Sequence, residues 1–436
     1  MFGFPKFGDG IGLHRIERFL QAHRIDRAAL ARRSIAVTGT NGKGSTARFM
    51  TSAIEAAGMR VGCFTSPHLF DVRERFTIGD TPIPQDAFDR HAATVQAFAA
   101  TLPTGDRMGG FEFLFLLAIL WFQEEKPDAI VWEAGIGGRY DPVRTVRASV
   151  SVLTSIELEH TELLGGTEEL IAYDKVDALA PGGCVVLSPS IPDTLALRIA
   201  AYANLAGKAT LPALASRRVT AVTNTHKGAR FSYGFTQAPQ EADQSVRLKL
   251  AGRHQVDNAV TALRAAEVWL GLKPEENAER HFAMLAGLGR TRWPGRLEKV
   301  STTPDLWIDV GHTPRALDAV TRTFLDFSPA DRTLVIFGVS ASKEVQGIAE
   351  VVASRFSHFI LTRAFKAGAD PTLFEHAFRS RSADVVVAPD TATAARFARD
   401  RAARDGLTAL ALGGLFLAAE VQHAWHCKDP RELDFF

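Results

Sequence analysis

Ile35-Ala-Val-Thr-Gly-Thr-Asn-Gly-Lys-Gly-Ser-Thr46 is the stretch that decides the fold. Its first three residues, 35–37, form an apolar run that is typical of a buried strand. Gly39 and Gly42 allow a tight turn and a close approach of the backbone to a ligand. From Ser45 to Met59 the apolar spacing predicts a helix. A strand, a glycine-rich turn and a helix N-terminus together form a phosphate cradle, because free N–H groups and the helix dipole favour an anion.

Two side chains add chemistry to this cradle. Lys43 places a positive charge where β- and γ-phosphates would lie, and Ser45 offers a hydroxyl to Mg²⁺. The spacing departs from the usual phosphate-loop pattern, since Val37 stands where its first glycine would be and Gly44 separates the lysine from the serine. A plain glycine-rich turn is the alternative interpretation. The order of strand, lysine, serine and helix favours binding of a nucleoside triphosphate.

The composition is that of an ordinary globular protein. Hydrophobic residues make up 46% and charged residues 23% of the 436 residues, and the net charge is +1. This charge favours neither nucleic acid nor an anionic membrane as a partner. Cys63, Cys184 and Cys427 are too widely spaced to indicate a disulfide framework or a zinc site. Without a signal-peptide pattern or an apolar stretch of roughly 20 residues, we expect a cytoplasmic enzyme of two or three domains.

Polar residues follow a series of predicted strands at their carboxyl ends. Ser66, Glu133 and His160 stand at or just beyond the ends of three of these strands. In an open α/β sheet, ligands bind outside the carboxyl ends of the strands. We therefore expect a doubly wound, mostly parallel sheet with the site along one rim. The strands are expected at 35–37, 60–65, 128–132 and 150–155, and helices at 85–100 and 111–122.

These polar residues, together with Ser45, could converge on a metal ion. Mg²⁺ accepts hydroxyl and carboxylate ligands, and a histidine suits a second, softer site that also accepts Mn²⁺. Taken singly, Glu133 is as readily a cap or an ion-pair partner, and His160 a structural histidine. Their shared position beyond neighbouring strands is what favours the metal interpretation.

A glycine-, arginine- and proline-rich stretch, Gly287–Arg296, lacks apolar periodicity and predicts a domain boundary. We place the first domain at 1–290 and the second at 291–436. Short apolar strands alternate with helices beyond this boundary and predict a smaller, Rossmann-like α/β domain. Its strands are expected at 306–309, 333–337, 359–361, 384–388 and 407–412.

Several motifs follow one another in a fixed order: Gly39-Thr-Asn-Gly-Lys-Gly-Ser-Thr46, Ser66-Pro-His-Leu69, Glu133-Ala-Gly-Ile-Gly-Gly-Arg139, Thr154-Ser-Ile156 with His160-Thr161, Trp293-Pro-Gly-Arg-Leu-Glu298 and Asp309-Val-Gly-His312. This series resembles the folylpolyglutamate synthase/dihydrofolate synthase branch of the Mur ligase family. The resemblance extends from about Gly12 to Gly414. It implies an enzyme that uses ATP to join a carboxylic acid to an amino acid, usually glutamate, through an acyl phosphate.

The resemblance also implies a role for each matching residue. Lys43, Lys175 and His312 would be catalytic, with Lys175 at the position of the family's carbamylated lysine. The ATP-binding residues would be Thr40, Asn41, Gly42, Lys43, Gly44, Ser45, Thr46, Asn258, Arg296 and Asp309. The metal ligands, for two Mg²⁺ ions, would be Ser45, Ser66, Glu133, His160 and Lys175. The second domain would close over ATP and exclude water.

The acid-substrate region departs from the family pattern. Gly109-Gly110 stands where the family has a threonine and an aromatic residue, and Tyr140-Asp-Pro-Val-Arg144 replaces Leu-Asp-Ala-x-Asn. Thr313 replaces the asparagine that usually follows the histidine. The residues implied to contact the acid are Phe111, Glu112, Tyr140, Asp141 and Arg144. Two interpretations stay open: a divergent but ordinary folate enzyme, or a ligase that adds an amino acid to a non-folate acid.

Two other classes of protein compete with the ligase. One is a non-catalytic nucleotide-binding protein, and the other is a small-molecule kinase, since phosphoryl transfer is the first half-reaction of such a ligase. The retained metal and ATP residues disfavour the first. We expect only small-molecule partners and a monomer, whereas the sequence names neither the acid nor the amino acid, nor whether addition is repeated.

Overall fold

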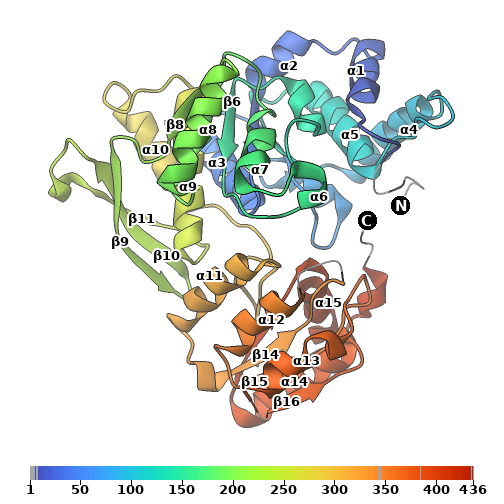
Figure 1. Ribbon diagram of the computed structural model, residues 1–436. Helices are drawn as coiled ribbons and strands as arrows, with labels where there is room; N and C mark the ends of the chain where they lie inside the picture. Colours follow the sequence, from blue (N-terminus) through green and yellow to red (C-terminus); the bar gives the residue numbers. More distant parts are fainter. Residues whose placement is uncertain (1–4, 6–7, 342–344, 383, 434, 436) are drawn as a thin grey trace.

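The computed structural model describes residue 5 and residues 8–341, 345–382, 384–433 and 435. Figure 1 shows two α/β bodies in succession along the chain, with a small antiparallel sheet at the side of the first. The first body contains an eight-stranded sheet in the order β4-β3-β2-β5-β1-β6-β7-β8, counted over the described residues. Its strands are β1 (Ser34–Thr38), β2 (Val61–Phe64), β3 (Phe76–Ile78), β4 (Thr81–Pro82), β5 (Ala129–Glu133), β6 (Val150–Leu153), β7 (Cys184–Leu187) and β8 (Ala209–Pro212).

The central strands are parallel, and at one edge of the described sheet β3 runs antiparallel to both of its neighbours, β2 and β4. Successive strand residues point to opposite faces of a sheet, and both faces of this one are apolar. Ala36 and Trp132 join one core cluster, whereas Ile35 and Val131 join the other. Burial on both faces explains why these strands read as continuous apolar runs.

Helices cover both faces of this sheet. One cluster contains residues of α1 (Leu13–Ala22), α2 (Arg27–Arg33), α4 (Gln85–Ala99), α5 (Gly110–Glu125), α7 (Glu168–Val176) and α8 (Asp193–Leu205). The other contains residues of α3 (Lys43–Ala56), α9 (Arg253–Trp269) and α10 (Ala278–Leu288), and of the antiparallel strands β10 (Gly228–Phe235) and β11 (Gln244–Arg247). The third antiparallel strand, β9 (Arg217–Thr225), packs against it. A short helix, α6 (Thr161–Leu164), follows β6.

The second body has a six-stranded sheet in the order β12-β13-β17-β14-β15-β16, again within the described residues. Only β12 is antiparallel to its neighbour. Its strands are β12 (Glu298–Thr302), β13 (Asp305–Ile308), β14 (Thr333–Phe337), β15 (His358–Leu361), β16 (Val385–Val387) and β17 (Thr408–Leu412). Its helices are α11 (Pro314–Leu325), α12 (Val345–Ala353), α13 (Glu375–Arg379), α14 (Thr391–Asp405) and α15 (Leu415–Trp425).

The predicted α/β class is confirmed. Every strand expected from the sequence is present, within a residue or two at each end, and α3 begins at Lys43 rather than at the expected Ser45. The expected boundary between residues 290 and 291 falls in the segment that joins α10 to β12. No helix in the described part of the chain is long and apolar enough to cross a membrane.

Candidate active site

The phosphate loop joins β1 to α3 and requires two glycines. Gly39 has a φ of 138° and Gly42 a φ of 83°, both in the left-handed range that favours glycine. A Cβ atom on Gly39 would lie 1.8 Å from the hydroxyl oxygen of Thr154. One on Gly42 would lie 2.6 Å from Oδ1 of Asn258, which α9 places beside the loop. The loop therefore has no room for side chains at either position.

The first turn of α3 carries two buried hydroxyls with nothing to bond. The side chains of Ser45 and Thr46 have no hydrogen-bond partner among the described residues. An unsatisfied buried polar group costs about 1–3 kcal/mol, so these hydroxyls favour a ligand at this helix N-terminus. A hydroxyl suits Mg²⁺, and the helix N-terminus suits phosphate oxygens. The residues present therefore fit a metal–nucleotide complex.

Gly44, the residue that interrupts the usual phosphate-loop spacing, is explained by the linker. A Cβ atom on Gly44 would lie 3.0 Å from Nε1 of Trp293. The indole ring has the guanidinium carbons of Arg48 and Arg296 at 5.9 Å each from its centre. The linker between the two bodies is thus packed directly on the first turn of α3, where a side chain at residue 44 would press on the ring.

Two lysines from distant parts of the chain converge on one carbonyl of the loop. Nζ of Lys43 donates to the carbonyl oxygens of Gly39, at 3.1 Å, and Thr40, at 3.0 Å. Nζ of Lys175, on α7, donates to the same Gly39 oxygen at 3.1 Å. Lys175 is buried, and burial together with the charge of Lys43 lowers the pKa of its amine to about 7. It is therefore not a solvated surface lysine.

Glu133 and Ser66 are adjacent at the carboxyl ends of β5 and β2. The backbone N–H of Ser66 donates to Oε2 of Glu133 at 2.9 Å. Burial raises the pKa of the Glu133 carboxyl to about 7, although Lys43, Ser66 and Arg296 all lower it. A further cation bound here would favour the ionised carboxylate. These two residues therefore fit the edge of a metal site.

His160 follows β6, on the opposite side of the phosphate loop from Glu133. It lies near Glu159, which is also close to His312 of the second body. Its Nε2 is 3.7 Å from Oε1 of Glu159, and Nε2 of His312 is 3.6 Å from the same oxygen. Among the described residues, no three or more His, Cys, Asp or Glu side chains form a ready metal cluster. A metal shared by the predicted ligands Ser45, Ser66, Glu133 and His160 therefore stays a prediction.

The second body brings a buried acidic residue to the same region. Asp309 follows β13 and accepts from the backbone N–H groups of Leu297, at 2.8 Å, and Gly311, at 2.7 Å. Burial raises its pKa, and the charge of Arg296 opposes that rise. Burial in turn lowers the pKa of Arg296, and Asp309 opposes this. The charges of Arg296, in the linker, and Asp309, after β13, thus stabilise one another within the same buried region.

The residues expected to contact the acid differ in the solvent exposure of their side chains. Tyr140 is 54% exposed, and Arg144 is exposed with its guanidinium donating to the carbonyl oxygen of Arg139 at 2.9 Å. Asp141 is buried and accepts from the N–H groups of Gly135 and Ile136, so it fixes the turn after β5. The ring of Phe111 covers that turn, 2.9 Å from where a Cβ of Gly135 would lie.

The carboxylate of Glu112 already has an ion-pair partner within the protein. Arg15, on α1, is fully buried and donates to both carboxylate oxygens of Glu112, at 2.7 and 2.8 Å. A second contact joins Arg15 to Asp106. The structure therefore gives Glu112 a structural partner, and a direct contact with the acid stays a prediction.

Glu112→Ala is expected to destabilise the fold, because it leaves the buried Arg15 with less of its compensating charge. Breaking a buried ion pair from one side costs about 3–5 kcal/mol, which urea denaturation would measure. Glu17→Ala, which breaks the more exposed Glu17–Arg27 pair, is the control and should cost less than about 1 kcal/mol. An unchanged stability with a raised KM for the acid would instead favour substrate contact.

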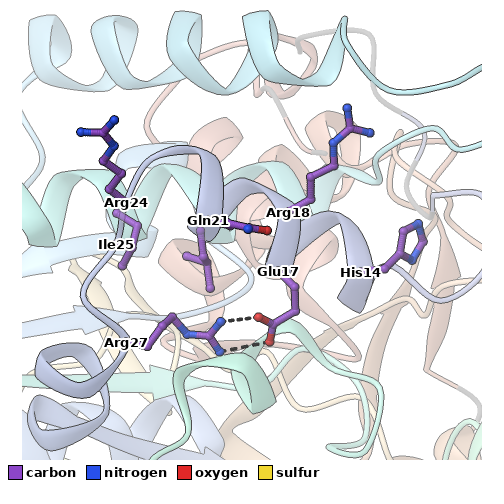
Figure 2. A pocket seen from close by; sticks show the side chains of 8 residues that line it. His14, Glu17, Arg18, Gln21, Arg24, Ile25 and Arg27 are labelled. Atoms are coloured by element: carbon purple, nitrogen blue, oxygen red, sulfur yellow. Dashed lines mark hydrogen bonds and ion pairs between the residues drawn. The ribbon is translucent and has the colours of Figure 1, made fainter.

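A hollow of about 670 Å³ lies along α1 and the start of α2. In Figure 2, Arg18 and Arg24 extend away from the pair that Glu17 forms with Arg27. The hollow is lined by His14, Glu17, Arg18, Leu20, Gln21, Arg24, Ile25 and Arg27. None of these residues belongs to the phosphate loop or to the strand ends around it, so we assign the hollow no part in the chemistry.

The residues that fix the loop after β2, which contains Ser66, were not predicted from the sequence. Leu69 is buried in the apolar core of the second body, beside Ile308 and Val310. The carboxylate of Glu74 accepts from three consecutive backbone N–H groups, those of residues 69–71. Asp71 and Glu74 form a capping box around the short turn Val72–Arg75. An acidic residue three positions after a cap is a known sequence signal and could have been used.

Two α/β bodies, with a phosphate loop in the first that the second body reaches, fit the nucleotide-dependent ligase expected from the sequence. Residues 295–415 match the family model described as Mur ligase, glutamate ligase domain. A solved bifunctional folylpolyglutamate synthase/dihydrofolate synthase with Mn, AMPPNP and L-glutamate bound is similar to this chain, with a TM-score of 0.78 and 25% identity. That similarity covers 95% of this chain and 94% of the other.

Relatives extend the match over most of the sequence. The folylpolyglutamate synthase of Lacticaseibacillus casei is 32% identical over 81% of each chain. A probable bifunctional folylpolyglutamate synthase/dihydropteroate synthase of Halobacterium salinarum is 33% identical over 90% of this chain, which spans only 47% of that longer protein. The chain belongs to the folylpolyglutamate synthase/dihydrofolate synthase branch of the Mur ligase family, a class of ATP-dependent ligases. The predicted resemblance and class of enzyme are confirmed.

Proposed function

We propose that this protein uses ATP to join the amino group of glutamate to a carboxylic acid of the pteroate or folate type. The observation that carries this proposal is the pair of unpartnered hydroxyls, Ser45 and Thr46, at the N-terminus of α3, with Lys43 beside them. A hydroxyl that can reach Mg²⁺, a lysine and a helix N-terminus together suit a metal–triphosphate complex. The names of the relatives supply glutamate and the folate-type acid.

The chemistry follows from the weakness of a carboxylate as an electrophile. Transfer of the γ-phosphoryl group to the carboxylate gives an acyl phosphate, which the amine attacks and from which phosphate then leaves. Lys43 balances negative charge on the moving phosphoryl group, which is the main catalytic task in such a transfer. Arg296 and Asp309 position the nucleotide from the second body. No side chain of the chain needs to act as a covalent nucleophile.

A divalent metal, Mg²⁺ in the proposed reaction, would supply further charge balance to the phosphates. Ser45, Ser66 and Glu133 would hold one ion, and His160 with a modified Lys175 a second. We propose that two divalent ions bind at this site rather than one. A monomeric state and a cytoplasmic location remain predictions from the sequence.

Product analysis tests the proposed function. With ATP, Mg²⁺, glutamate and dihydropteroate or a folate, phosphate should be released only when both the acid and glutamate are present. A stable phosphorylated acid formed without an amine would identify a kinase instead. If phosphate release with glutamate requires a different aryl acid, the protein is a ligase of the same class for a non-folate acid.

Arg144→Ala is expected to raise the KM for the acid while leaving the KM for ATP nearly unchanged. An exposed guanidinium can bind a carboxylate through two hydrogen bonds, and the exposed Tyr140 in the same segment can stack on a planar ring. If the departures at residues 140–144 select a non-folate acid instead, activity on dihydropteroate should be weaker than on that acid. Steady-state kinetics with each substrate varied in turn measures both. Efficient use of dihydropteroate or a folate that Arg144→Ala does not affect would contradict a role of Arg144 in binding the acid and would favour the ordinary folate substrate.

A further inference from the structure

The phosphate loop and the second body are joined by a small hydrogen-bonded triangle. Nδ2 of Asn41, in the loop, donates to Oε1 of Glu157 at 2.8 Å and to the hydroxyl oxygen of Thr313 at 3.2 Å. The hydroxyl of Thr313 donates to Oε2 of Glu157 at 3.1 Å. Asn41 and Glu157 belong to the first body, whereas Thr313 precedes α11 in the second. All three side chains are partly buried.

The hydroxyl of Thr313 uses its full bonding capacity. A threonine hydroxyl has one donor and two acceptor positions. It donates to Glu157, and it accepts from Asn41 and, at 3.2 Å, from the backbone N–H of Ala316, so that it also caps α11. One atom thus connects the phosphate loop, the segment after β6 and the first turn of a helix in the other body.

Glu157 is also fixed through its backbone. Its N–H donates to the hydroxyl of Thr40 at 3.1 Å, and the N–H of Thr40 donates to the carbonyl oxygen of Ser155 at 2.8 Å. The N–H of Asn41 donates to the hydroxyl of Ser155 at 2.9 Å. The segment 155–157 therefore runs beside the phosphate loop, and the carboxylate of Glu157 is the part that reaches across to the second body.

We propose that Glu157 and Thr313 are positioning residues that hold the side chain of Asn41 in its nucleotide-binding orientation, and that the Thr313 part of this hold is made only while the second body is docked. This inference rests on the proposed function, because it assumes that the loop binds ATP. The proposal also assigns a role to Thr313, which replaces the asparagine usual in the family. Its single hydroxyl forms hydrogen bonds with a carboxylate and an amide at the same time. The link couples closure of the two bodies to the shape of the phosphate site.

The test uses Glu157→Ala and Thr313→Val in the full chain. Each variant removes one corner of the triangle, so each should raise the KM for ATP about tenfold and leave the KM for glutamate within about twofold. The double variant should be no worse than either single variant, because the same link is already broken. Thr313→Ser keeps the hydroxyl and should behave as the unaltered protein. Additive losses in the double variant would overturn the proposal.

Asp326→Ala is the matched control. Nδ2 of Asn224 donates to Oδ2 of Asp326 at 2.7 Å, so this pair also joins the two bodies, but at the other end of α11. Its loss should leave the KM for ATP unchanged. An equal rise in Asp326→Ala would mean that any loosening of the two bodies has the same effect, and would overturn the specific role of Glu157.

A binding measurement separates the inference from the proposed function. The thermal shift caused by AMPPNP with Mg²⁺ needs no acid substrate, and it should fall in Glu157→Ala, which leaves the α11 cap intact, even if Thr313→Val is less stable. If the unaltered protein shows no shift, the proposed function and this inference both fail. If the unaltered protein and both variants show equal shifts, only this inference fails.

Discussion

Lys43→Ala is expected to abolish ligation and to leave the fold intact. The ammonium group of Lys43 lies over the loop and donates to the carbonyl oxygens of residues 39 and 40. When ATP binds, its charged phosphate oxygens would replace these neutral acceptors and form stronger hydrogen bonds. Its removal leaves the transferred phosphoryl group without a fixed positive charge. Losing a preorganised group that stabilises transition-state charge costs at least about 100-fold in kcat, and we expect a loss at or beyond that size.

The measurement is phosphate release in the presence of acid, glutamate and ATP, with thermal unfolding as the check on folding. Lys43 is only partly buried, so its truncation removes little apolar packing. Lys273→Ala is the control, since Lys273 is exposed and its ammonium group pairs with the exposed Glu276, and it should retain full activity. Ligation by Lys43→Ala at the rate of the unaltered protein would contradict the assignment of the phosphate loop and, with it, the proposed chemistry.

The sequence was sufficient for the parallel sheets because their strands are apolar on both faces. Residues such as Ile35 and Trp132 lie in continuous runs that no solvent-facing position interrupts. The antiparallel strands β9 and β10 were missed, although Ala229, Phe231 and Tyr233 alternate with polar residues and are buried. The two residues between these strands, His226 and Lys227, carry none of the glycine or asparagine signals that mark a tight hairpin.

The positions of some candidate site residues could be predicted where a polar residue follows a strand. Ser66, Glu133 and Lys43 lie around one loop, as their places in the sequence suggested, and their roles stay predictions. Contacts that depend on tertiary packing left no such signal. The partner of Glu112 is Arg15, 97 residues away, and the oxygen between His160 and His312 depends on how the two bodies dock. The glycine at position 44 is explained by the ring of Trp293, and the packing of the linker on α3 could not be predicted from the sequence.

Lys175→Ala is expected to lose most of the activity, because we propose that this lysine carries a carbamate. Its amine is buried beside the phosphate loop, with the carbonyl oxygen of Gly39 as its hydrogen-bond acceptor among the described residues. A buried ammonium without a carboxylate partner is unfavourable. Reaction of the uncharged amine with CO₂ forms an N–C bond and releases a proton, and it gives a carboxylate-like group that suits a metal ion.

A second buried lysine provides the contrast. Lys208 is also buried, but its Nζ lies 2.7 Å from Oδ1 of Asp177, so its charge is balanced without modification. With ¹³C-labelled bicarbonate, one carbamate signal is expected in the NMR spectrum of the protein, absent from Lys175→Ala and unchanged in Lys208→Arg. Activity should fall in bicarbonate-free buffer, and short carboxylic acids should partly restore Lys175→Ala by filling the vacated space. Full activity in Lys175→Ala without any added acid would show that no carbamate is needed and that a second metal ion, if bound, has other ligands.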